Sequence, residues 1–211
     1  MRTINLLLCN ALNGLTYRLM GLFLISGPVQ AGMIDKETMA PWEICGLCHS
    51  LNGISPTAKF PTLAGQKAAY IKKQFIEFNQ QIRTNGGGQM VAITTEVDVQ
   101  TIDAIANYFS ALSPPPAKTK DEVGNGYELG KVLFTKGRGE LPACITCHGS
   151  PKSPAPWLYA QHGRYLIKQL SDFKSGHRLN DEGETMRKIA SMLREQDMAA
   201  IAGYLEVTQP R

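Results

Sequence analysis

The chain has 211 residues, 22 of them basic and 18 acidic, with a formal net charge of +4. Hydrophobic residues make up 43% and charged residues 19%, which is normal for a soluble globular protein of one ordinary domain or two small ones. A positive balance this weak gives no argument for nucleic acid as a partner, and we expect none.

Residues 1–31 have the pattern of a secretory signal peptide. They carry Arg2 and Arg18 but no acidic residue, and an apolar run at 19–25 is followed by Val-Gln-Ala at 29–31. The apolar run is far shorter than the roughly 20 residues that a spanning helix needs, although a retained membrane anchor is the alternative. We therefore expect cleavage before Gly32 and export to the periplasm.

Helical signals follow in both halves of the mature chain. Apolar side chains recur three or four residues apart over 67–82 and over 99–109, where Asp98 offers an N-cap and Ser113-Pro114 a stop. The opening helix before this region is interrupted by Pro41. We predict a first domain over 32–113.

A Pro-rich, polar segment at 114–121 reads as a stiff linker to a second domain over 122–211. This domain opens with a helix around 127–134 and ends on one around 196–205. No strand longer than a few residues is indicated, so the predicted fold class is all-α.

Four of the five cysteines form two C-x-x-C pairs, and a histidine follows each pair. The two motifs are Cys45-Gly46-Leu47-Cys48-His49 and Cys144-Ile145-Thr146-Cys147-His148. C-x-x-C-H is the attachment motif of c-type haem: two thiols add across the two vinyl groups of the macrocycle, and the next residue turns its imidazole onto the iron. The sequence therefore predicts two covalently bound haem c groups.

Two alternatives use the same residues. A thioredoxin-type redox pair needs a βαβ setting, and neither flank has the β-branched strands for it. A single zinc site using both pairs would have to bridge a separation in sequence that matches no compact zinc ribbon. Cys9 lies within the expected signal peptide.

An internal repeat extends this interpretation over the mature chain. Seven residues recur at a constant offset of 95, namely Pro61, Leu63, Gln66, Tyr70, Gln74, Phe78 and Arg83, matched by Pro156, Leu158, Gln161, Tyr165, Gln169, Phe173 and Arg178. The chain is a duplication, with one haem expected in each copy.

The repeat also indicates the second axial ligands. Haem iron in an electron carrier commonly takes Met or His as sixth ligand. Met90 and Met186 correspond at an offset of 96, each in a Gly-rich or polar stretch, whereas Met192 and Met198 have no methionine partner. The spacing of Met198 with apolar neighbours instead predicts a core position.

Two further histidines are less suitable. His162 corresponds to Lys67 in the first copy, and His177 has no histidine counterpart. We expect both to be solvated surface residues rather than ligands.

The chain resembles the cytochrome c4 family, the two-domain dihaem carriers of bacterial periplasms. The resemblance rests on C-x-x-C-H, P-x-L-x-x-Q-x-x-x-Y-x-x-x-Q, F-x-x-x-x-R, M-x-x-I and A-x-Y, each occurring twice. It implies two tandem cytochrome c-type domains, each wrapped around one haem. His49 and Met90 would bind one iron, and His148 and Met186 the other. The carbonyls of Pro61 and Pro156 would hold the rings of the two histidines.

Ser50 is a departure, since the family commonly has glycine there. With both irons six-coordinate no position is open for a substrate, so we expect an electron-transfer protein and no enzyme. The expected partners are redox proteins: a quinol-oxidising complex or dehydrogenase as donor and a terminal oxidase as acceptor. A loose association with the inner membrane surface is compatible with this role.

Two other functions stay open. The chain could be the dihaem cytochrome subunit of a sulfur-compound-oxidising flavoenzyme complex, which has the same architecture. A dihaem peroxidase-like enzyme would need an open or displaceable ligand at one iron, against which the two matched methionines argue.

Overall fold

The computed structural model describes residues 39–116, 118–119 and 126–209, all within one compact unit. The expected signal peptide and part of the expected linker lie outside the described residues. No helix in the described part of the chain is long and apolar enough to cross a membrane. Below, residues 39–116 are called the N-terminal half and residues 126–209 the C-terminal half.

The described residues confirm the all-α fold class. Their only strand-like pairing is one antiparallel bridge between Arg138 and Leu141. The elements in chain order are α1 (Glu43–His49), α2 (Ala68–Asn79), α3 (Gln89–Glu96), the 3-10 turn η1 (Val99–Thr101), α4 (Ile102–Ala111), α5 (Tyr127–Lys136), α6 (Ile145–His148), α7 (Gly163–Ser175), the 3-10 turn η3 (Glu182–Glu184), α8 (Thr185–Ser191) and α9 (Glu195–Glu206).

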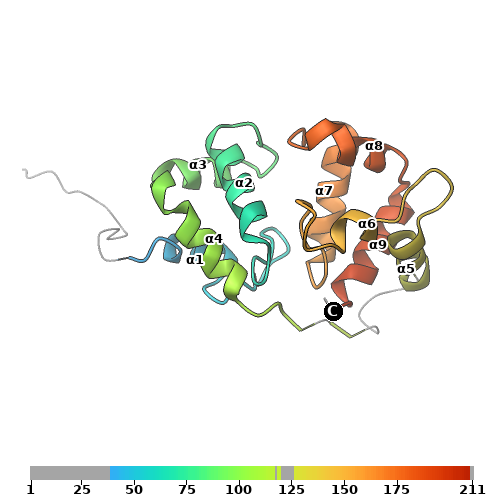
Figure 1. The fold of residues 1–211 in the computed structure, drawn as a ribbon, viewed down its shortest axis with the longest axis horizontal. Coiled ribbons are helices and arrows are strands. Elements are labelled where there is room, and N and C mark those ends of the chain that lie inside the picture. Colours follow the sequence, from blue (N-terminus) through green and yellow to red (C-terminus); the bar gives the residue numbers. More distant parts are fainter. Residues whose placement is uncertain (1–38, 117, 120–125, 210–211) are drawn as a thin grey trace, which may run out of the picture. The chain divides into compact units, whose positions relative to one another are not determined.

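The N-terminal half packs α2 and α4 around a small apolar core (Figure 1). Its buried residues are Ile71, Phe75, Ile102, Ile105, Ala106 and Phe109. The Asp98 carboxylate accepts the backbone N–H of Gln100 at 2.9 Å, which caps η1 and the start of α4 as the sequence predicted. Trp42, just before α1, stacks on Tyr108 of α4 with ring centroids 4.6 Å apart. These contacts bring the first cysteine motif against α4.

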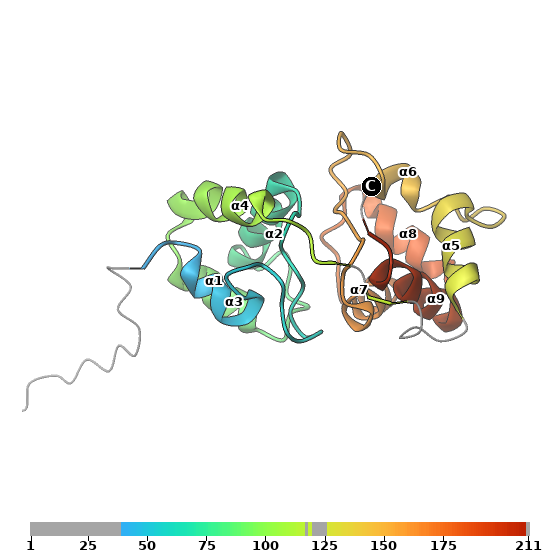
Figure 2. The same ribbon diagram turned by 90° about the horizontal axis from the view of Figure 1, so that it is seen from below.

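The C-terminal half has a larger core, in which α5 and α7 pack on α9 (Figure 2). Its buried residues are Leu133, Phe134, Leu141, Leu166, Leu193, Met198, Ile201, Ala202, Tyr204 and Leu205. A Cβ at Gly130 would lie 2.0 Å from the carbonyl oxygen of Ala200, so glycine is required where α5 approaches α9. Met198 is a core residue, as its spacing predicted.

Most predicted helices are present with shifted ends. The helix predicted over 67–82 ends at Asn79, because Gln81 has a φ of 58° that no α-helix accommodates. The opening helix of the first copy is intact: it begins at Glu43, two residues after Pro41. Helices α3, α6, α7 and α8 were not predicted. Helices α3, α6 and α8 have eight, four and seven residues, so each offers few turns over which an apolar spacing can recur.

A buried carboxylate ties together two parts of the C-terminal half. Asp197 in α9 is 0% exposed and accepts two hydrogen bonds of 2.8 Å from the Arg138 guanidinium. Arg194 adds two side-chain bonds and one backbone bond, each of 3.0 Å. The hydrogen bonds from Arg138 and Arg194 hold the pKa of Asp197 far below its usual 3.8. The carboxylate is therefore ionised at any pH above 3.8, and in that range its hydrogen bonds stabilise the fold.

Replacing Asp197 by asparagine is expected to lower the free energy of unfolding by about 2 kcal/mol at pH 7, the scale of hydrogen bonds to charged groups. Because the folded-state pKa lies far below the unfolded value of 3.8, the contribution declines progressively as pH falls from 3.8 towards the folded-state pKa, and the difference between wild type and variant should narrow over that range. Denaturant unfolding of the holoprotein, at pH 7 and at pH values below 3.8, measures the loss of unfolding free energy and its dependence on pH.

The matched control is Asp103→Asn, which removes a carboxylate 67% exposed in an ion pair with Lys72 and should change stability little. Equal effects of the two substitutions would contradict a special role for Asp197.

Candidate haem sites

Helix α1 presents the first cysteine motif. Cys45 and Cys48 are unpaired and half-buried, and His49 at the end of the helix is 5% exposed. The Nδ1 atom of His49 lies 2.8 Å from the carbonyl oxygen of Pro61. The proline that the family resemblance assigned to this histidine therefore contacts it.

The second motif repeats this geometry. Cys144 is half-buried at the N-cap of α6, Cys147 is exposed, and His148 is 6% exposed. The Nδ1 atom of His148 lies 2.8 Å from the carbonyl oxygen of Pro156. Both histidines thus sit in matching environments.

These contacts determine which ring nitrogen of each histidine is free. A carbonyl oxygen only accepts, so Nδ1–H of His49 and of His148 must donate to it. Burial lowers the pKa of both histidines, although the proline carbonyls act in the opposite direction, and for His148 the charge of Lys67 lowers it further. Each ring is therefore neutral at pH 7 and keeps an Nε2 lone pair for a metal.

The thiols do not behave as a redox pair. Burial raises the pKa of Cys45 and of Cys144 to about 11. A thioredoxin-type cysteine requires the opposite, a lowered pKa that yields a thiolate near pH 7. No group of three or more His, Cys, Asp or Glu side chains that could hold a metal ion occurs among the described residues.

The donor set fits haem c at both motifs. Each offers two free thiols three residues apart, and beside them a neutral histidine with an oriented ring. A domain of this size has only a marginal polypeptide core, and the apolar face of a haem would enlarge it.

Each candidate sixth ligand lies near the start of a short helix. Met90 is the second residue of α3 and Met186 the second residue of α8, and both are half-buried. Equivalent residues thus occupy equivalent places in the two halves. Met192, which has no methionine partner in the first copy, is the C-cap residue of α8 and is 42% exposed.

One of the two histidine predictions is wrong. His177 is exposed and contacts the Ser175 hydroxyl at 2.7 Å. His162, in contrast, is half-buried, and its Nε2 atom donates to the carbonyl oxygen of Ser55 in the N-terminal half at 2.9 Å. The sequence alone gave no sign of this contact, because Ser55 is 107 positions away.

The repeated polar residues join the two halves, a role that was not predicted from the sequence. Arg83 donates to Gln74 at 2.6 Å and to Gln169 at 2.8 Å. Arg178 mirrors it, donating to Gln169 at 2.8 Å and to Gln74 at 3.1 Å. Burial alone would raise the pKa of Tyr70, but the charges of Arg178 and Arg83 hold it below its usual value. The recurrence of these polar residues at an offset of 95 was the feature of the sequence from which their shared role could have been predicted.

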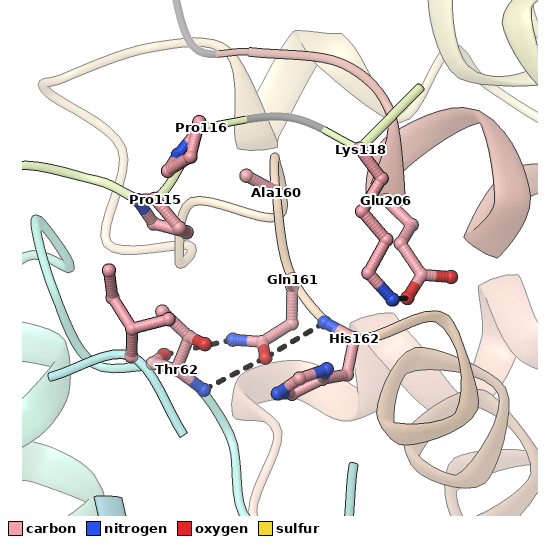
Figure 3. A pocket seen from close by; sticks show the side chains of 9 residues that line it. Thr62, Pro115, Pro116, Lys118, Ala160, Gln161, His162 and Glu206 are labelled. Atoms are coloured by element: carbon pink, nitrogen blue, oxygen red, sulfur yellow. Dashed lines mark hydrogen bonds and ion pairs between the residues drawn. The ribbon is translucent and has the colours of Figure 1, made fainter. Parts of the chain in front are cut away.

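A second group of contacts between the halves lines a pocket of about 160 Å³ (Figure 3). Figure 3 shows the Gln161 amide directed at the backbone of Thr62, with His162 beside it. Lys118 and Glu206 form an ion pair of 2.6 Å on the opposite side of the pocket.

The departure at Ser50 has a structural cost. Ser50 has φ 61° and ψ 152°, a region that glycine occupies freely and other residues rarely adopt. The equivalent Gly149 has φ −102°, so the two motifs leave their helices along different paths.

A duplicated helical unit, with a C-x-x-C-H motif and a proline-held histidine in each copy, defines a dihaem c-type cytochrome. Residues 127–209 match the family described as Cytochrome c. Cytochrome c4 of Pseudomonas aeruginosa is 36% identical over 205 residues, covering 91% of this chain and 94% of the relative. The crystal structure of reduced recombinant cytochrome c4 from Pseudomonas stutzeri superposes with a TM-score of 0.70 at 29% identity, covering 79% of this chain and 94% of that chain.

The chain belongs to the cytochrome c4 family. It is an electron-transfer protein with two covalently bound haem c groups. A thiosulfate dehydrogenase electron acceptor of Stutzerimonas stutzeri is also similar, at 31% identity over 169 residues, covering 76% of each chain.

Proposed function

We propose that the protein is a periplasmic carrier that takes electrons from a quinol-oxidising complex or a dehydrogenase and passes them, through its two haems, to a terminal oxidase. Its domains would span 32–113 and 122–211, joined by the linker at 114–121, after removal of residues 1–31. The observation that carries this proposal is the duplicated site, in which a proline-held histidine and a half-buried methionine recur in both halves.

The roles of the residues follow from their chemistry. Haem c supplies an iron that gains and loses one electron. Cys45 and Cys48 would hold one haem by thioether bonds, and Cys144 and Cys147 the other. His49 and His148 would each present Nε2 to an iron, while Pro61 and Pro156 fix the tautomer and the ring orientation.

Methionine would complete each site. Met90 and Met186 would each supply a thioether sulfur to one iron, which would leave no place for a substrate. A thioether ligand raises the reduction potential relative to a second histidine, which suits a carrier that delivers to an oxidase. The same closure argues against peroxidase chemistry.

A second candidate function is favoured by similarity to thiosulfate dehydrogenase electron acceptors. In that case the donor would be an enzyme that oxidises a sulfur compound, and this chain would be its dedicated acceptor. The residues that hold the haems would be unchanged, and only the docking partner would differ.

Carbon monoxide binding tests whether the sites are closed. The reduced protein is expected to bind carbon monoxide poorly at neutral pH and to show little peroxidase turnover, because a histidine and a methionine would hold each iron. Met186→Ala is the positive control, since it opens one position. Rapid stoichiometric binding by the wild type would favour the enzyme over the carrier.

Stopped-flow mixing separates the two carrier functions. A general carrier, reduced beforehand, should be oxidised rapidly by a terminal oxidase, and its oxidised form should accept electrons slowly from a thiosulfate dehydrogenase. The reverse order of rates would favour the dedicated acceptor.

A further inference from the structure

The loop between His148 and Pro156 is held by residues from the other half of the molecule. Gln66 accepts the backbone N–H of Trp157 at 2.9 Å and donates to the Trp157 carbonyl oxygen at 2.9 Å. Lys67 Nζ donates to three carbonyl oxygens of the loop, those of Ser150, Ser153 and Ala155, at 2.8, 2.7 and 2.7 Å. The backbone is thus held on both sides of Pro156, the residue whose carbonyl orients His148.

The mirror contact exists in the opposite direction (Figure 3). Gln161 accepts the backbone N–H of Thr62 at 2.9 Å and donates to the Thr62 carbonyl oxygen at 2.9 Å. Thr62 directly follows Pro61, whose carbonyl orients His49. In each direction a buried glutamine of one half fixes the residue after the histidine-holding proline of the other.

The contact made by Gln66 and the contact made by Gln161 differ in the residue that follows the glutamine. Lys67 uses its three N–H donors on three carbonyls, and its Nζ also lies 4.1 Å from the centre of the Trp157 ring. His162 occupies the equivalent position, and its ring Nε2 donates to one carbonyl oxygen, that of Ser55, at 2.9 Å. The C-terminal loop is therefore held at more points than the N-terminal one.

A backbone contact of this kind bears directly on a haem ligand. The hydrogen bond from Nδ1–H of a ligating histidine to a carbonyl fixes the ring orientation and raises the basicity of the ligand. A more basic ligand stabilises oxidised iron and lowers the reduction potential. Side chains that hold the proline in place therefore influence the reduction potential of the haem that the histidine would bind.

We propose that each half positions the axial histidine of the other, through Gln66 and Lys67 acting on His148 and through Gln161 and His162 acting on His49. These four are positioning residues. The inference rests on the proposed assignment of His49 and His148 as ligands. The potential of each haem then depends on the docking of the opposite half.

Gln66→Leu and Gln161→Leu test the crossed dependence without changing the charge. The readouts are the reduction potential of each haem and its hyperfine-shifted NMR signals, assigned to the C-terminal haem by their loss or displacement in Met186→Ala. Gln66→Leu should raise the potential and shift the signals of the C-terminal haem alone, and Gln161→Leu those of the N-terminal haem alone. The second effect should be the larger, because Lys67 still holds the C-terminal loop after the first substitution.

Lys67→Gln is an independent test. Gln66→Leu and Gln161→Leu each remove two hydrogen bonds at a buried contact, which can also destabilise the fold, whereas Lys67 contacts the loop through its side chain alone. Lys67→Gln should shift the NMR signals of the C-terminal haem only. The matched control Lys72→Gln removes one positive charge from α2, whose N-cap is Lys67; the Lys72 side chain pairs with the exposed Asp103, and its loss should shift neither set.

Changes confined to the haem of the substituted half, equal changes at both haems, or no change in Lys67→Gln would overturn the inference. These outcomes are distinguishable from a wrong ligand assignment, because the hyperfine-shifted imidazole signals of the wild-type haems report histidine ligation independently. If those signals are present for both haems and the crossed pattern fails, only the positioning role is lost.

Discussion

Replacing Met186 by alanine is expected to remove half of the far-red methionine–iron absorption of the oxidised protein and to open one haem to exogenous ligands. Met186 and Met90 are half-buried second residues of short helices, α8 and α3, in equivalent places of the two halves. Alanine has no atom that can donate to iron, so the loss at that haem should be complete. Absorption spectra, with and without added imidazole, measure it.

Met192→Ala is the control for this prediction. Met192 is 42% exposed at the end of α8, so truncating it leaves no large cavity and should cost little stability. His177 is no better alternative, since it is exposed and contacts Ser175. If Met192→Ala removed the absorption and Met186→Ala left it intact, the assignment of the sixth ligand would fall.

The second large effect concerns haem attachment. Cys45→Ala combined with Cys48→Ala should yield a protein with one haem, and its N-terminal half should be largely unfolded. The core of that half contains six buried residues, too few to offset the entropy of ordering a domain of this size without a haem. Intact-protein mass spectrometry gives the number of haems, and far-UV circular dichroism gives the helix lost.

The matched double substitution is Cys144→Ala with Cys147→Ala. It should also leave one haem, but it should cost less helix, because the C-terminal half has ten buried residues in its core and the Asp197 cluster besides. Two haems in either variant would contradict the attachment sites. Full retention of helix in the first variant would contradict the structural role of the haem.

Much of this molecule could be predicted from its sequence because the relevant chemistry is local. Two thiols and a histidine within five residues are enough to define covalent haem attachment. The helices α2, α4, α5 and α9 follow from apolar spacing within a dozen residues. The duplication added Met90 and Met186, since a correspondence at one offset needs no knowledge of three-dimensional contacts.

What only the tertiary structure decided are contacts between residues far apart in the chain. Gln66 contacts Trp157 across 91 positions and Gln161 contacts Thr62 across 99, and no local pattern distinguishes such a glutamine from a solvated one. His162 was mistaken for a surface residue for the same reason. A side chain's partner depends on how two cores pack, and polar pairing across an interface leaves no periodicity in the sequence. The sequence therefore predicts where the haems attach, whereas the tertiary structure decided which residues of one half contact the candidate haem site of the other.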